Sequence, residues 1–133
     1  MRAVKAVDGA AAIVECPEPD SAGVLVEVAS AGICSSDIHL LDWGVPVVLG
    51  HEMAGRLPDG TPVAVEPVDP CWKCPQCKEG AYNLCEKGPS MVLGVGRDGG
   101  MAERCTVPES SIIPLPAGLA LGDACLIERG RIE

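Results

Sequence analysis

The stretch 70–87 constrains this chain more than any other segment, since it reads PCWKCPQCKEGAYNLCEK and holds four of the eight cysteines. The four follow the spacing C-x2-C-x2-C-x7-C and are Cys71, Cys74, Cys77 and Cys85. Thiolates spaced this closely can meet at one Zn2+ ion, which takes four sulfur ligands at about 2.3 Å. Such a closed site leaves no position for a substrate. The spacing predicts a structural zinc lobe at roughly residues 69–88, in preference to two disulfides or four reduced surface thiols.

The composition favours many short strands around an aliphatic core. The 133 residues include 16 glycines and 12 prolines, which suit turns better than long helices. Aromatic side chains are scarce, with two Trp, one Tyr and no Phe. A chain of this length forms one domain, expected to span residues 1–133. The predicted fold class is mainly β with few short helices.

The formal net charge of −9 argues against nucleic-acid binding, because phosphate backbones attract Lys and Arg. No apolar run reaches the roughly 18 residues that a membrane helix needs, and the N-terminus does not follow the pattern of a signal peptide. We therefore expect a protein of the reducing cytoplasm that binds neither nucleic acid nor membranes.

Short apolar stretches between turn residues predict the order of the elements. The dipeptide Asp8-Gly9 is typical of a hairpin turn. A short helix that starts at a cysteine is expected to place Ile38, Leu41 and Trp43 on one side. Strands are expected at 2–7, 11–15, 24–29, 47–49, 61–68, 91–95, 101–107 and 111–115, and helices at 34–43 and 119–131.

A second metal site is indicated by side chains near the ends of two predicted strands. Cys34 begins the predicted helix, His51 follows a strand, and the carboxylates of Asp37 and Glu52 lie close to them in sequence. A thiolate, an imidazole and a carboxylate can serve as three zinc ligands and leave a fourth position open. The alternative is an ordinary buried thiol and a core histidine.

The local backbone restricts this second site. Neighbouring side chains of a strand point to opposite faces, so His51 and Glu52 cannot reach one ion from a regular strand. They can ligate together only if Gly50 or Gly55 kinks the chain. Sequence spacing alone therefore does not decide whether these residues form a metal site.

Taken in order, the motifs resemble the zinc-containing medium-chain alcohol dehydrogenases, and most closely their polyol, sugar and threonine dehydrogenase branch. The resemblance implies a GroES-like catalytic domain, a partly open β-barrel with a four-cysteine zinc lobe. It also implies two Zn2+ ions per chain, one structural and one catalytic. The segments that carry it are AGICSSDIH (31–39), VVLGHEMAG (47–55), the four-cysteine stretch (71–85), DGGMAERCTVPES (98–110) and LIE (126–128).

The same resemblance assigns residues to the catalytic zinc. Cys34 and His51 are implied as ligands, and Glu52 as a ligand or a close neighbour of the ligands. Asp37 is implied as the carboxylate that orients the imidazole of His51. Glu128 matches the carboxylate of the family's LIEP segment, which approaches the zinc from the far end of the domain.

The implied reaction converts a small alcohol, polyol or sugar into a carbonyl compound and passes hydride to NAD or NADP. Zn2+ favours the alkoxide form of a bound alcohol. Ser36 matches the hydroxyl that takes the substrate's proton, and His39 matches the histidine that hands this proton to solvent.

The sequence departs from the family after residue 128. The family continues into a dinucleotide-binding domain, whereas Arg129 follows here and the chain ends at Glu133. The run Gly94–Gly99 fits G-x-G-x-x-G, but strand formers and Pro108 follow it, which predicts a turn. We therefore expect a truncated catalytic domain without a Rossmann domain, inactive alone and not binding NAD or NADP. The alternative is a non-catalytic, zinc-stabilised β-barrel that binds a partner or a small molecule without redox chemistry. Homo-oligomerisation stays open.

Overall fold

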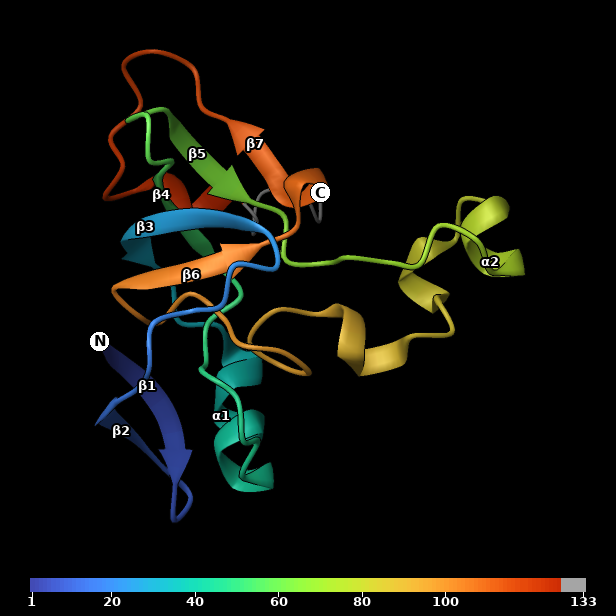
Figure 1. The fold of residues 1–133 in the computed structure, drawn as a ribbon. Coiled ribbons are helices and arrows are strands. Elements are labelled where there is room, and N and C mark those ends of the chain that lie inside the picture. The colour runs from blue at the N-terminus through green and yellow to red at the C-terminus, as the bar shows by residue number, and fades with distance from the viewer. Residues whose placement is uncertain (128–133) are drawn as a thin grey trace.

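A five-stranded antiparallel sheet forms the centre of the computed structural model, which describes residues 1–127 (Figure 1). The strands lie in the order β6-β3-β4-β5-β7. The sheet curls into a half-barrel, which confirms the mainly β fold class. The strand bounds are Val24–Ala31 for β3, Met53–Arg56 for β4, Pro62–Val65 for β5, Arg104–Val107 for β6 and Ile112–Pro114 for β7.

The N-terminal hairpin pairs β1, Arg2–Val7, with β2, Ala10–Glu15. Asp8 and Gly9 at its turn have φ values of 49° and 77°, which is the left-handed geometry that this dipeptide predicts. The hairpin is tied to the rest of the molecule through β1, because Leu49 N–H donates to Val4 O at 2.9 Å.

Helices are few and short. The longest is α1, Ser35–Trp43, which ends at Gly44 in the left-handed conformation, with φ of 62°. A single turn, α2, spans Pro75–Lys78 in a lobe that protrudes from the sheet (Figure 1). Four 3-10 turns complete the set for residues 1–127: Tyr82–Leu84, Gly88–Met91, Glu109–Ser111 and Ala124–Ile127.

The core of the sheet contains no aromatic side chain, as the composition predicts. Its members come from β3, β4, β5 and β6, together with one residue that follows the lobe. They are Val26, Met53, Val63, Val65, Leu93, Cys105 and Val107. Each is at most 3% exposed, so a substitution that changes the volume of one of these side chains even slightly will affect the stability of the fold.

Gly55 in β4 shows how closely the strands pack. A Cβ at this position would collide with the carbonyl oxygen of Glu27 in β3. We expect Gly55→Ala to cost about 1–3 kcal/mol and to lower the melting temperature by on the order of 5–10 °C. Gly122→Ala is the matched control, because its Cβ would meet nothing within 4 Å. Equal melting temperatures of the two variants would contradict this packing.

The expected apolar side of α1 is wrong. Ile38 and Trp43 are 60% and 74% exposed, whereas Leu40 is 2% exposed. The helix is oriented by Asp37, whose carboxylate is buried at its first turn. Residues three apart share one side of a helix, so Leu40 follows Asp37 inward.

Three expected elements are also revised. No strand forms at 91–95, where Met91 ends a 3-10 turn and Val92 and Leu93 make only isolated bridges. The stretch 47–49 forms no strand, because its hydrogen bonds go to separate partners: Val48 O accepts from Gly99, and Leu49 N–H donates to Val4 O. The helix expected at 119–131 is reduced, within its described part, to the 3-10 turn Ala124–Ile127. Glycine lowers helix stability by about 1 kcal/mol, and Gly122 lies just before this turn.

Candidate metal centres

The four cysteines of the lobe converge on one point. One Sγ atom from each of Cys71, Cys74, Cys77 and Cys85 lies within 4.8 Å of the others. Cys71 is half-buried and the other three are buried. Backbone N–H groups point at the sulfurs: Cys71 N–H donates to Cys85 Sγ and Cys74 N–H to Cys71 Sγ, both at 3.3 Å. Hydrogen bonds of this kind favour thiolates, so the donor set fits a zinc site with four sulfur ligands.

Local sequence explains how the lobe forms. Cys74 caps α2 and Pro75 occupies its first position, where proline is favoured. Gly80 has a φ of 85°, which lets the chain turn back toward the fourth cysteine. The N–H groups of Lys73 and Cys74 lower the pKa of the Cys71 thiol to about 6. A thiol ionised near neutral pH is ready to bind a metal.

A second cluster joins two distant parts of the chain. One ligand atom each from Cys34, His51 and Glu52 lies within 4.8 Å of the others. Cys34 follows β3, and the other two residues precede β4, so the antiparallel pairing of these strands brings them together. Gly50 has a φ of 96° and provides the kink that lets His51 and Glu52 face one point. Gly55, the other glycine expected to allow this kink, lies within the strand β4.

Asp37 holds two members of this cluster at once. Its Oδ2 accepts the Cys34 N–H at 2.8 Å, and its Oδ1 lies 3.7 Å from His51 Nδ1. Sequence reasoning placed Asp37 beside His51 but missed the bond to Cys34. The available signal was the spacing C-x-x-D, because a carboxylate at the third helical position often reaches back to the capping residue's N–H.

Glu52 provides the strongest indication of a cation. It is 1% exposed, and neither Oε1 nor Oε2 has a hydrogen-bond partner within the described part of the chain. A buried carboxylate without a partner costs several kcal/mol, which a bound cation removes. A thiolate, an imidazole and a carboxylate fit zinc and leave its fourth position open.

Gly32 was missed by sequence reasoning although it shapes this cluster. Its N–H donates to Glu52 O at 2.7 Å. A Cβ at position 32 would collide with Glu52 Oε2, so only glycine leaves room for the carboxylate. The signal was a glycine two residues before Cys34.

The other residues predicted for the catalytic site differ in their distance from the second cluster. Ser36 Oγ lies 3.3 Å from His51 Nε2, which puts this hydroxyl beside the cluster. His39 lies on the exposed side of α1, where its ring stacks on Trp43 with centroids 6.3 Å apart. The structure thus brings Ser36 to the cluster of Cys34, His51 and Glu52 and leaves His39 facing solvent. Glu128 lies outside the described residues.

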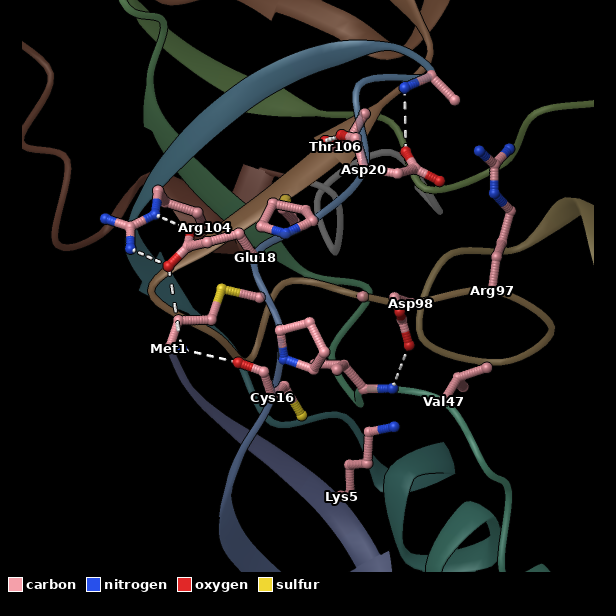
Figure 2. A pocket seen from close by; sticks show the side chains of 16 residues that line it. Met1, Lys5, Cys16, Glu18, Asp20, Val47, Arg97, Asp98, Arg104 and Thr106 are labelled. Carbon is pink, nitrogen blue, oxygen red and sulfur yellow. Dashed lines mark hydrogen bonds and ion pairs between the residues drawn. The ribbon is translucent and has the colours of Figure 1, made fainter.

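A cavity of about 520 Å³, lined by no residue of either cluster, lies against the connection between β2 and β3 (Figure 2). Charged groups in its wall pair with their neighbours. Arg104 donates two hydrogen bonds of 2.7 Å to the Glu18 carboxylate, and the N-terminal ammonium donates to Cys16 O at 2.7 Å. No ligand is assigned to this cavity, because these groups already have partners.

No helix within residues 1–127 has both the length and the apolar character needed to cross a membrane.

Comparisons with known proteins agree with the fold. The model of the alcohol dehydrogenase GroES-like domain matches residues 20–117. L-galactonate-5-dehydrogenase of Escherichia coli K12 is 40% identical over 131 residues, covering 86% of this chain and 37% of that protein.

Solved structures give the same picture. Galactitol-1-phosphate dehydrogenase from Escherichia coli has a TM-score of 0.84 and 32% identity, over 96% of this chain and 42% of that one. A cobalt- and zinc-bound thermostable alcohol dehydrogenase from Pyrobaculum aerophilum has a TM-score of 0.77 and 27% identity, over 96% of this chain and 44% of that one. The chain thus spans less than half the length of these relatives. The resemblance drawn from the motifs is confirmed, and the chain belongs to the alcohol dehydrogenase GroES-like domain family.

Proposed function

We propose that this chain is the zinc-binding catalytic domain of an alcohol or polyol dehydrogenase that oxidises an alcohol to a carbonyl compound and passes hydride to NAD or NADP. The observation that carries the proposal is the buried carboxylate of Glu52, unpartnered among residues 1–127, beside Cys34 and His51. Relatives named for galactonate and galactitol phosphate support a polyol or sugar as substrate. Eight free thiols, five of them proposed ligands, support a reducing compartment such as the cytoplasm.

In this proposal each chain holds two Zn2+ ions. The four cysteines of the lobe bind the structural ion. Cys34, His51 and Glu52 would hold the catalytic ion, and a set of three protein ligands would leave room for the substrate hydroxyl. Glu128 stays a candidate for the same site.

The residues around the second site have separate roles. Bound zinc supplies Lewis acidity, which favours the alkoxide form of an alcohol. Asp37 fixes the orientation of the His51 ring and the position of Cys34. Ser36 Oγ takes the proton of the substrate hydroxyl. His39, one turn farther along α1 and exposed, releases the proton to solvent.

We place the nicotinamide site outside residues 1–127. All pairings between the named strands of this part are antiparallel, whereas a dinucleotide-binding unit needs parallel strands joined by a helix. The run Gly94–Gly99 forms a turn, in which Gly94 N–H donates to Arg97 O at 2.8 Å. Its glycines allow close packing against the backbone of Gly50.

The proposal is tested with a chain whose lobe holds zinc and whose second site holds Co2+. Coordination by Cys34 is expected to give a cobalt–thiolate absorption band, and adding a six-carbon polyol should shift the spectrum through the open position. Cys34→Ser should abolish the band. Cys16→Ser should keep it, because Cys16 lines the separate cavity.

Two outcomes would contradict the proposal. Absence of a cobalt–thiolate band in the wild-type chain would remove the second metal site. A band that no alcohol or polyol perturbs would instead favour a non-catalytic zinc-binding module.

A further inference from the structure

The segment 93–101, here called the strap, lies against the turn that presents His51. Three successive N–H groups of the strap, from Gly99, Gly100 and Met101, donate to the carbonyl oxygens of Val48, Gly50 and Leu49, each at 2.8 Å. Asp98 Oδ1 also accepts the Val48 N–H at 2.8 Å. The backbone immediately before His51 is therefore fixed mainly by the strap.

Steric contacts make this attachment stiff. A Cβ on Gly94 would lie 2.7 Å from Gly50 O, and a Cβ on Gly99 would lie 2.8 Å from Leu49 O. The strap and the turn are thus in direct backbone contact without side chains between them. Because packed interiors have little free volume, a displacement of the strap moves the turn as well.

The other end of the strap is anchored at the base of the zinc lobe. Leu93 N–H donates to Pro67 O at 3.0 Å. Arg97 Nη1 donates to Asp69 Oδ2 at 3.1 Å, and Lys87 Nζ lies 3.3 Å from the same oxygen. Asp69 precedes Cys71 by two residues and Lys87 follows Cys85 by two, so one carboxylate holds both ends of the lobe and the strap.

We propose that Arg97 is a positioning residue that couples the structural zinc lobe to the catalytic metal site. Its ion pair with Asp69 fixes the strap, and the strap fixes the turn at Gly50 from which His51 projects. Zinc in the lobe keeps Cys71 and Cys85 together and so keeps Asp69 and Lys87 in place. The second zinc therefore binds more tightly when the lobe is filled, and by reciprocity the lobe binds more tightly when the second site is filled. This inference rests on the proposed function, because it takes Cys34, His51 and Glu52 as zinc ligands.

The test is the dissociation constant of the second zinc, measured on the 133-residue chain by competition with a chromophoric chelator. Arg97→Ala is expected to weaken the second zinc by about twofold to thirtyfold, the range of typical coupling effects, while the first zinc binds as in the wild type. Arg97→Lys keeps the charge and should restore part of the affinity. Asp69→Asn, which removes the other partner, should weaken the second zinc in the same way.

Arg104→Ala is the matched control. Arg104 lines the same cavity as Arg97 and pairs with Glu18 at 2.7 Å, away from the strap (Figure 2). The Arg104→Ala variant loses the same charge as Arg97→Ala, and it should change the dissociation constant of the second zinc by less than about twofold.

The outcomes separate this inference from the proposed function. A wild-type chain that binds no second zinc overturns both. A second zinc that binds equally well in wild type, Arg97→Ala and Asp69→Asn overturns the coupling alone. Equal weakening by Arg97→Ala and Arg104→Ala also overturns it, because net charge would then be the cause.

Discussion

Replacing Cys77 by serine is expected to unfold the lobe and to lower the melting temperature of the zinc-loaded chain by roughly 10 °C or more. Cys77 is 8% exposed and shares one point with three other cysteines. The lobe contains only a single helical turn and short 3-10 turns, so we expect its order to depend on a bound metal. Binding free energy at a structural zinc site is folding free energy, and losing one of four ligands removes most of it.

Two controls define this effect. Cys16→Ser removes a half-buried cysteine that belongs to neither cluster and should shift the melting temperature by less than about 2 °C. His51→Ala should leave the fold largely intact, because the second site lies on segments that the sheet already holds. If Cys77→Ser melts at the wild-type temperature, the lobe is not structural in the sense proposed.

No oxidation of alcohols or polyols by the 133-residue chain alone is expected with NAD or NADP. A nicotinamide that is not held near the substrate loses orientation effects worth about 7–11 kcal/mol. This loss slows turnover by roughly five to eight orders of magnitude, below detection. The measurement is nicotinamide absorbance over hours with added polyol and Zn2+.

The control for this experiment is His51→Ala, which removes a proposed zinc ligand. Metal-dependent reduction of the cofactor that His51→Ala abolishes would show that the chain carries a nicotinamide site of its own. A site formed between two copies of the chain would give the same signal with a steep dependence on protein concentration.

Local features of the structure followed from the sequence. The four lobe cysteines lie close together in sequence, so their convergence could be predicted from their spacing. The bends at Pro75 and Gly80 are enough to bring the four sulfur atoms together. Asp8-Gly9 set the hairpin turn through its left-handed preference. These signals act over a few residues and need no knowledge of distant partners.

Features that depend on distant contacts did not follow from spacing or periodicity, and only the family resemblance predicted that Cys34 and His51 meet. Cys34 and His51 meet only because β3 pairs with β4, and no spacing rule contains that pairing. The orientation of α1 depends on the buried carboxylate of Asp37, so counting apolar residues chose the wrong side of the helix. The hydrogen bonds between the strap and the turn at Gly50 join residues about 50 positions apart in the sequence.

Zinc content per chain is the measurement that tests the central claim most directly. A chain purified without chelators and then fully loaded should contain close to two zinc ions by elemental analysis. Cys34→Ala and His51→Ala should each lower the content to close to one, because one ligand of the second site is lost while the four lobe cysteines remain. A single zinc ion in the wild-type chain, kept unchanged in both variants, would contradict the catalytic site and leave only the structural one.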